Sequence, residues 1–274
     1  MNLKGINLAE ANIKALNEAS RRSRYHWIKD KPDPRDHIFQ AVPLKAIPPS
    51  IDLRQWCSPI EDQGYLGSCT GNAIAGQIEL IDRKNNKNLD VSRLFIYYQE
   101  RVYENTVRWD AGAYIRDGLK AVNQVGAPLE TLWPYIESKF AVKPTTAAYT
   151  DAARRKVTGY AKCTNFTSVK NALAAGNPVT VGFYVYESFE WAQNTNTGVM
   201  PYPNTAREAF LGGHAVCLVG YDDNFRGTGQ GYFIARNSWG TSWGDNGYFY
   251  MPYQVIQNTS MSSDFWTIST VRNP

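Results

Sequence analysis

A cysteine, a histidine and an asparagine occur in this order, each within a distinctive short motif far from the others. Cys69 ends the segment Gln-Gly-Tyr-Leu-Gly-Ser-Cys, His214 is the second residue of Gly-His-Ala-Val, and Asn237 begins Asn-Ser-Trp-Gly. Cys69 and His214 are 145 residues apart (214 − 69), and Asn237 follows 23 residues after His214 (237 − 214). A thiol nucleophile, its base and the residue that orients the base have this order and spacing. We therefore expect a fold that brings these three distant segments together.

The residues after Cys69 predict a helix that begins at the nucleophile. Ala73, Ile74, Ile78 and Ile81 follow the spacing of a buried helical stripe. Cys69 would then lie in the first turn, where the backbone N–H groups have no intrahelical partner and the helix dipole is positive. A free thiol titrates near pH 8.5, and such a dipole, or a nearby imidazolium, lowers that pKa. His214 is the candidate imidazolium.

The three motifs resemble those of the papain family of cysteine peptidases, over about residues 51–269, and the chain looks most like a bacterial member of the xylellain type. The resemblance implies an α+β fold of two lobes, a helical left lobe and a β-barrel-like right lobe, with the active-site cleft between them. It also implies that Cys69 attacks a peptide carbonyl, that His214 serves as its base and that Asn237 orients the imidazole. The side-chain amide of Gln63 and the backbone N–H of Cys69 would hold the oxyanion.

Each of these residues also has a non-catalytic interpretation. Cys69 could be a small buried apolar residue, His214 a core histidine, Asn237 a turn residue and Gln63 a surface residue. The rare context of Cys69 favours catalysis, and the other histidines, His26 and His37, both precede it. A non-catalytic binding protein on a peptidase fold is a further alternative, but such proteins usually lack the Cys or the His. An acyltransferase would share the same acyl-enzyme step, and the sequence does not separate it from a hydrolase.

The resemblance extends to a peptide-binding groove, with four candidate residues. Gly112, within Asp-Ala-Gly-Ala-Tyr, would let a substrate strand pair with its backbone, and Ala113 stands where a second glycine is common. Val179 and Ala215 would line an apolar pocket. The chain departs from the family pattern at Leu66, where many members have Cys, and at Thr70, where many have Trp.

Composition excludes several other classes. The 274 residues are 43% apolar and 20% charged, with a net charge of +4, and show no clustered basic stripe, phosphate-binding glycine loop or Cys/His metal spacing. We therefore expect a monomer that acts on peptides or proteins, with no nucleic-acid partner, metal or cofactor. No apolar run approaches the length of a membrane span, and the N-terminus lacks the apolar core of a signal peptide. A soluble protein is expected, in the cytoplasm or secreted by an unusual route.

With Cys69 a free thiol, three cysteines remain, so at most one internal disulfide can form. Cys57 with Cys163 is the one pair considered, whereas Cys217 lies in an apolar run typical of a core strand. This chain is not disulfide-rich, so its fold does not require an oxidising compartment.

The chain divides into a leader, residues 1–50, and a peptidase domain, residues 51–274. The leader contains a weak helix over 7–24 and then an extended proline-rich linker. It either crosses the cleft and keeps the enzyme latent or packs elsewhere as a structural arm. The domain should have a helical lobe over about 60–160 and a β lobe over about 161–270. We expect further helices over 92–100, 113–124 and 167–175, and strands over 179–185, 214–221, 231–236, 247–251 and 264–269.

Overall fold

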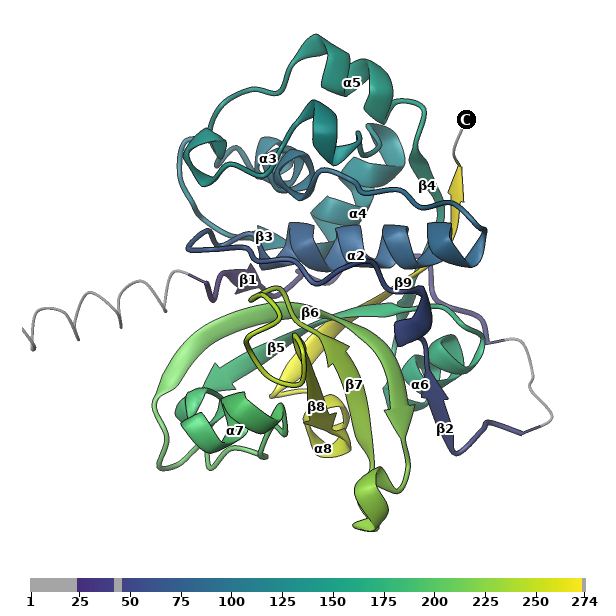
Figure 1. The fold of residues 1–274 in the computed structure, drawn as a ribbon, viewed down its shortest axis with the longest axis vertical. Helices are drawn as coiled ribbons and strands as arrows, with labels where there is room; N and C mark the ends of the chain where they lie inside the picture. Colours follow the sequence, from purple (N-terminus) through teal and green to yellow (C-terminus); the bar gives the residue numbers. More distant parts are fainter. Residues whose placement is uncertain (1–23, 42–45, 273–274) are drawn as a thin grey trace, which may run out of the picture.

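The computed structural model describes residues 24–41 and 46–272, and its architecture is α+β (Figure 1). Several helices gather on one side, and a large antiparallel sheet lies on the other side with shorter helices around it. The helices are α2 (Cys69–Lys84), α3 (Arg93–Glu104), α4 (Ile115–Gln124), α5 (Thr146–Ala152), α6 (Phe166–Ala174), α7 (Ala192–Thr197) and α8 (Tyr253–Gln257). The strands are β1 (Trp27–Ile28), β2 (Ser50–Asp52), β3 (Ala113–Tyr114), β4 (Lys156–Cys163), β5 (Val179–Tyr186), β6 (Phe210–Asp222), β7 (Tyr232–Arg236), β8 (Tyr248–Pro252) and β9 (Ser262–Arg272).

Helix α2 lies between the helices and the sheet (Figure 1). It packs against α3 and α4 on one side and against β6 and β9 on the other, and every residue from Cys69 to Asp82 is buried. A helix enclosed on both sides is favoured by apolar and small residues, and this segment supplies four alanine or glycine residues besides its isoleucines. Its buried polar side chains have partners: Gln77 donates to the Trp266 carbonyl at 2.8 Å, and Glu79 accepts from the Val91 N–H at 3.0 Å. The first residue of α2 therefore sits at the junction of the two halves.

The other expected helices are present, with shifted ends. Ser92 caps α3 by accepting a hydrogen bond from the Phe95 N–H at 3.1 Å, and the helix continues to Glu104. Helix α4 begins at Ile115 rather than at Ala113, because Ala113 and Tyr114 pair with β1 as strand β3. Helix α6 matches its expected range to within one residue and begins with a capping box at Asn165.

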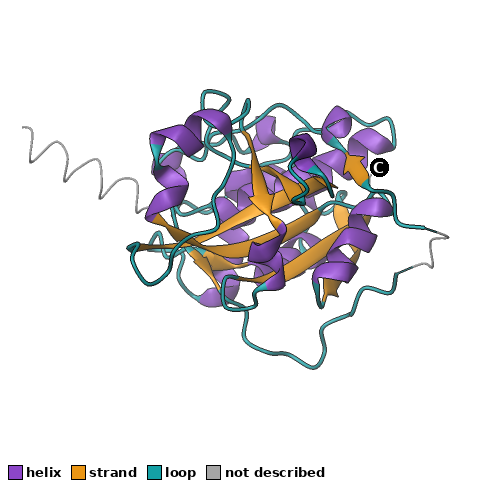
Figure 2. Ribbon diagram, turned by 90° about the horizontal axis from the view of Figure 1, so that it is seen from below, coloured by secondary structure: helices purple, strands orange, loops and turns teal. Residues whose placement is uncertain are grey.

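The sheet is antiparallel throughout, in the order β4-β9-β5-β6-β7-β8, with β2 added to β6. Figure 2 shows the curved strands with helices around them. The five strands expected from the sequence are present, and β6 and β9 are longer than expected. Strand β4 was not expected, although Lys156, Thr158 and Lys162 fall on one face, because Gly159 and Ala161 leave the other face with few large apolar residues. In the register of β5 and β6, Gly182 lies opposite Ala215 and Phe183 lies opposite His214.

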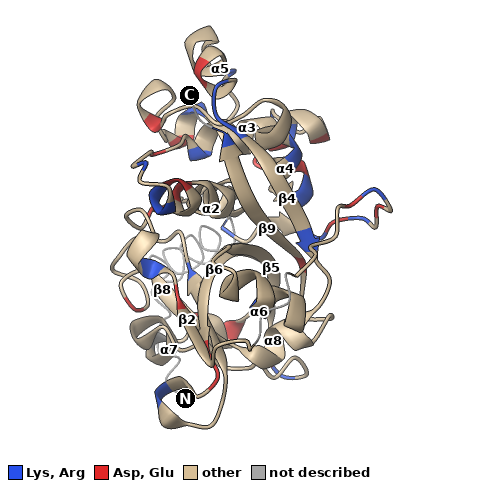
Figure 3. Ribbon diagram, turned by 90° about the vertical axis from the view of Figure 1, so that its right-hand side faces the viewer, with Lys and Arg blue, Asp and Glu red and all other residues tan. Residues whose placement is uncertain are grey.

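Residues 24–41, here called the strap, run across the rest of the molecule as an extended chain. Strand β1 pairs in parallel with β3, and Ile38 forms a bridge with Lys162 of β4. The helix expected over 7–24 lies outside the described residues, except for Arg24. In the strap, lysine and arginine alternate with aspartate, and the strands of the sheet are mostly uncharged (Figure 3).

All four cysteines are free, so the disulfide considered between Cys57 and Cys163 is not present. Cys57 lies near Tyr248 and Arg236 beside β7 and β8, whereas Cys163 ends β4 next to Phe265 of β9. Among the described helices, none combines the length and the apolarity that crossing a membrane requires.

Candidate active site

Cys69 is the first residue of α2 and is wholly buried. Its sulfur lies within hydrogen-bonding reach of the backbones of Thr70, Ala215 and His26. Ser68 precedes the helix, but its hydroxyl bonds to the Tyr135 hydroxyl at 2.5 Å instead of capping the helix. The first-turn N–H groups therefore remain directed at the cysteine, and Ala215 brings strand β6 to the sulfur.

His214 lies on β6, directly before Ala215, and its imidazole is fixed by two neighbours. Its Nε2 is 2.8 Å from the side-chain oxygen Oδ1 of Asn237. The indole of Trp239 stacks on the imidazole with ring centroids 4.9 Å apart and planes 29° apart. Because Oδ1 of Asn237 can only accept, Nε2 carries the proton and Nδ1 holds the free lone pair. Nδ1 is buried and has no hydrogen-bond partner among residues 24–41 and 46–272.

Gln63 is also wholly buried, and its amide is held at both ends. Its oxygen accepts from the Ser238 hydroxyl at 2.7 Å and from the Trp239 indole N–H at 3.2 Å. Its nitrogen donates to the Leu66 carbonyl at 2.8 Å and to the Arg24 carbonyl at 3.4 Å. The segment that follows Asn237 therefore orients Gln63 as well.

Burial keeps both members of the Cys–His pair neutral in this form of the protein. Loss of solvent raises the pKa of the Cys69 thiol to about 12. The same effect lowers the pKa of His214 to about 4, although its hydrogen bond with Asn237 acts in the opposite direction. Charged forms are disfavoured away from water. A thiolate–imidazolium pair therefore requires a more open site than this one.

The strap closes the site. His26 forms a bridge with Gly213, and Trp27 pairs with Ala113, so the strap backbone lies between β6 and β3. The ring of Tyr25 meets the imidazole of His214 edge-on, with centroids 5.9 Å apart, and its hydroxyl bonds to Glu190. The segment 24–28 thus passes directly over the three motif residues.

Two glycines make room for the strap backbone. Gly112 has a φ of +73°, and a Cβ there would lie 1.8 Å from the His26 carbonyl oxygen. A Cβ on Gly67 would lie 2.3 Å from Nδ1 of His26. Any other residue at position 112 would collide with the strap backbone. It would also have to adopt a left-handed conformation, which favours glycine.

The structure brings together most of the residues expected from the sequence. Cys69, His214, Asn237 and Gln63 meet at the junction of α2 and the sheet, and Gly112, Ala113 and Ala215 line the path of the strap.

Val179 does not join this group. It is wholly buried at the start of β5, on the face that it shares with Phe183. The residue of β5 that meets the strap is Gly182, where a Cβ would lie 1.9 Å from the Trp27 ring. Strand alternation places 180, 182 and 184 on one face, and this signal could have identified Gly182.

The two departures from the family pattern are accommodated by local packing. Leu66 is buried against the cluster that contains Phe95 and Trp133. The Thr70 hydroxyl donates to the buried carboxyl group of Glu100 at 2.7 Å, and burial raises the pKa of Glu100 well above its usual range. Within residues 24–41 and 46–272, no hydrogen bond joins Leu66 or Thr70 to the imidazole or to Asn237.

Comparisons with known proteins agree with this site. A family model described as papain family cysteine protease matches residues 47–268. A peptidase C1-like protein of Acanthamoeba polyphaga mimivirus is 41% identical, over 91% of this chain and 88% of its own. The crystal structure of xylellain, a cysteine protease from Xylella fastidiosa, is 38% identical with a TM-score of 0.83, over 92% of this chain and 97% of that chain. Procathepsin L 3 of Tenebrio molitor has the same fold, at 19% identity and a TM-score of 0.72, over 96% of this chain and 87% of that one.

A match that covers most of the chain, together with a relative of more than 40% identity over nearly its whole length, shows the family. The chain belongs to the papain family of cysteine proteases.

Proposed function

We propose that this protease hydrolyses internal peptide bonds by a Cys69–His214–Asn237 mechanism and is held latent by its own strap. The hydrogen bond of 2.8 Å between His214 and Asn237, beside a cysteine at the start of α2, carries the mechanism. It leaves Nδ1 of His214 as the free base on the strand that reaches the Cys69 sulfur.

The reaction follows from these positions. His214 takes the thiol proton, and the Cys69 sulfur attacks the peptide carbonyl to form a tetrahedral oxyanion. The imidazolium then donates its proton to the leaving amine, and a thioester remains on Cys69. A water molecule, deprotonated by His214, attacks the thioester carbonyl. The C–S bond then breaks, the acyl group leaves as a carboxylic acid, and His214 returns the proton to the Cys69 sulfur. The first turn of α2 and the side-chain amide of Gln63 stabilise the oxyanion in both steps.

Gln63→Ala is expected to lower kcat by about 10²- to 10³-fold, because the oxyanion loses one fixed donor. KM should change little, since the donor acts on charge that develops only in the transition state. Steady-state kinetics on a fluorogenic peptide measure both values. The matched control is Gln230→Ala, at an exposed position. Loss confined to KM would argue against an oxyanion role for Gln63.

The substrate groove follows the path of the strap. Ala113 offers a short backbone edge to β1, and Gly112 allows a chain to approach without a Cβ in the way. An extended peptide would use the same edge for main-chain hydrogen bonds. Gly112, Ala113 and Ala215 are therefore the proposed walls of the groove.

The proposal that the enzyme is latent rests on the strap, which occupies the proposed substrate groove. Segment 24–28 fills this groove, its Arg24 carbonyl accepts from the Gln63 amide, and its Tyr25 ring covers His214. A substrate and the strap cannot occupy the same space. Hydrolysis then requires release of the strap.

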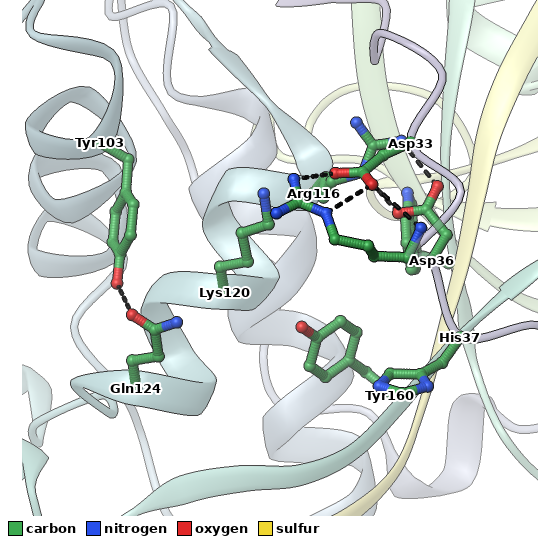
Figure 4. A pocket seen from close by; sticks show the side chains of 10 residues that line it. Asp33, Asp36, His37, Tyr103, Arg116, Lys120, Gln124 and Tyr160 are labelled. Atoms are coloured by element: carbon green, nitrogen blue, oxygen red, sulfur yellow. Dashed lines mark hydrogen bonds and ion pairs between the residues drawn. The ribbon is translucent and has the colours of Figure 1, made fainter.

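Arg116, the second residue of α4, anchors the strap behind the site. Its guanidinium forms two hydrogen bonds of 2.7 Å with the Asp36 carboxylate and one of 2.6 Å with the Lys31 carbonyl. It also lies 3.9 Å from Asp30, whose carboxylate accepts from the Trp266 indole at 2.8 Å. Figure 4 shows the Arg116 side chain directed toward the strap.

Asp30 links strap docking to pH. Burial raises its pKa to about 7, the nearby Asp264 carboxylate adds to this, and Trp266 and Arg116 act in the opposite direction. Other charged groups also surround the Asp30–Asp264 pair. Lys29 and Lys162 act on Asp264, Glu104 interacts with Asp30, and Asp36 pairs with Lys162. In a released strap the pKa of Asp30 returns to about 4. Between about pH 4 and 7 the docked form therefore holds a proton that the released form lacks.

Acid is therefore expected to tighten docking, and a rise of pH through this window to weaken it, by up to about tenfold per unit. The measurement is the alkylation rate of Cys69 by iodoacetamide in the wild type divided by that in Asp30→Asn, since the pH dependence of the thiolate is common to both. This ratio should rise between pH 5 and 7.5. A flat or falling ratio would show that Asp30 does not control docking.

A further inference from the structure

We infer that Asp110 is a positioning residue that acts through Gln63, the proposed oxyanion donor. Residues 63–68, here called the nucleophile loop, lead directly into α2, and Asp110 lies in the loop between α3 and β3. Its carboxylate joins the nucleophile loop to the proposed groove wall at Gly112. The inference rests on the proposed function and deepens it, because it gives a role to a residue outside the three motifs.

The peptide unit between Leu66 and Gly67 is held on both sides. Its carbonyl accepts from the Gln63 side-chain nitrogen at 2.8 Å. Its N–H is 3.0 Å from each of the two oxygens of the Asp110 carboxylate, to which it donates. Because a peptide unit is planar and rigid, the bond at its N–H also fixes the direction of its carbonyl. Asp110 therefore sets the position at which the Gln63 amide is anchored.

This anchor orients the N–H of Gln63 that would serve the oxyanion. The amide nitrogen carries two N–H groups. One donates to the Leu66 carbonyl, and the nitrogen also lies 3.4 Å from the Arg24 carbonyl of the strap, so the second N–H becomes free when the strap leaves. An anchor that moves would leave this donor less well preorganised. The loss would be partial, because Ser238 and Trp239 still donate to the Gln63 oxygen.

The same carboxylate reaches the groove wall through Tyr97. The Tyr97 hydroxyl donates to Asp110 and accepts from the Gly112 N–H at 3.1 Å. Burial and the adjacent Asp110 carboxylate raise the pKa of Tyr97, so the hydroxyl stays protonated and remains a donor. The Arg101 guanidinium lies 4.0 Å from the centre of the Tyr97 ring and donates to the Trp109 carbonyl at 3.2 Å. These contacts fix the Tyr97 ring and the backbone directly before Asp110.

A carboxylate that accepts from a backbone N–H can also serve the fold alone, and Asp151 is such a group. It accepts from the Leu129 N–H at 2.9 Å and pairs with Arg155. Like Asp110, it is half-buried and belongs to the helical lobe, but it lies on α5, away from α2 and β6 (Figure 1). Asp151→Ala is therefore the matched control for Asp110→Ala.

The test is a double-mutant cycle between Asp110→Ala and Gln63→Ala. The full chain carries Arg116→Ala to loosen the strap, and kcat is expressed per titrated Cys69 thiol. We expect Asp110→Ala to lower kcat by about 10-fold when Gln63 is present and by less than about twofold when it is already alanine. Equal losses in the two backgrounds would show that Asp110 serves the fold and would overturn the inference. If Arg116→Ala is no more active than the wild type, the same cycle is run without it.

Two further variants separate positioning from a general loss of stability. Asp110→Asn keeps a side-chain oxygen that can accept from the Gly67 N–H, so kcat should stay within about threefold of the parent. Asp151→Ala should leave kcat within about twofold in both backgrounds. A loss in Asp151→Ala as large as that in Asp110→Ala would contradict a specific role of Asp110.

A measurement without turnover separates this inference from the proposed function. In the ¹⁵N-labelled full chain, the side-chain amide resonance of Gln63 is assigned by its loss in Gln63→Ala. It should shift or broaden in Asp110→Ala and stay unchanged in Asp151→Ala. If hydrolysis does not depend on Cys69, the peptidase proposal fails, and this resonance alone decides whether Asp110 positions Gln63. A resonance unchanged in Asp110→Ala overturns the inference. If Asp110→Ala does not fold, Asp110→Ser takes its place in both experiments, since its shorter side chain does not extend to the carboxylate position.

Discussion

Replacing Cys69 with alanine is expected to abolish peptide hydrolysis, lowering kcat by about 10⁴-fold or more. The change removes the sulfur that would form the covalent intermediate. The hydrogen bond between His214 and Asn237 and the one between Ser238 and Gln63 should both remain. The fold should survive, because alanine also suits the buried first turn of α2. The assay is hydrolysis of a peptide pool read by mass spectrometry, with thermal unfolding as the measure of folding.

The matched control is Cys57→Ala, at a half-buried thiol beside Tyr248. It removes a cysteine without touching the groove, so hydrolysis should remain within about twofold of wild type. Hydrolysis that persists in a folded Cys69→Ala protein would mean that another group attacks the peptide bond.

Arg116→Ala is expected to activate the full-length protein by about 10- to 100-fold. In the docked form the change removes the guanidinium from the largely buried Asp36 carboxylate and from the Lys31 carbonyl, and loss of a buried ion-pair partner is strongly destabilising. In the released form the Asp36 carboxylate is in water and loses little. The difference favours release of the strap and exposes Cys69. The initial rate on a fluorogenic peptide, at pH 6 and at equal protein concentration, measures the gain.

Arg35→Ala is the control for this prediction. Arg35 lies within the strap and pairs with Asp33, but its side chain is 84% exposed, so Arg35→Ala should remain as latent as the wild type. Equal activation by both variants would indicate a general loss of stability. No activation by Arg116→Ala would mean that the strap does not limit the reaction.

Much of the fold was predictable because its signals are local. The alternation of most long strands, the Ser92 cap and the apolar stripe of α2 all act over a few residues, and these elements form where they were expected. Short elements that depend on distant partners were not predictable. Strands β1 and β3 are only two residues each and exist because the strap lies against residues 113–114.

The residues proposed for catalysis could be singled out from the sequence for a related reason. Each lies in a motif whose neighbours also have roles: Trp239 stacks on His214, and Ser238 holds Gln63. The pocket residues lack such motifs. Gly182 stands out only through its pairing with Ala215 and its contact with Trp27, and both depend on the tertiary structure.

The protonation states of Cys69 and His214 could not be predicted from the sequence either. The motifs favour a thiolate–imidazolium pair, whereas burial beneath the strap raises the pKa of Cys69 and lowers that of His214. Solvent exposure of a site depends on what covers it, and here the cover comes from a segment more than 40 residues before the nucleophile (69 − 26 = 43). The same geometry links the proposed latency to a neutral site.

The most direct test of a latent thiol peptidase is mass spectrometry of the acyl-enzyme. The full-length wild type and Arg116→Ala are mixed with an activated peptide ester, quenched in acid within the first turnover and digested. We predict that the acyl mass appears on the Cys69 peptide of Arg116→Ala in near-stoichiometric amount and is far lower in the wild type. An acyl group on another residue, or none on Cys69 in the variant while the ester is consumed, would contradict the account.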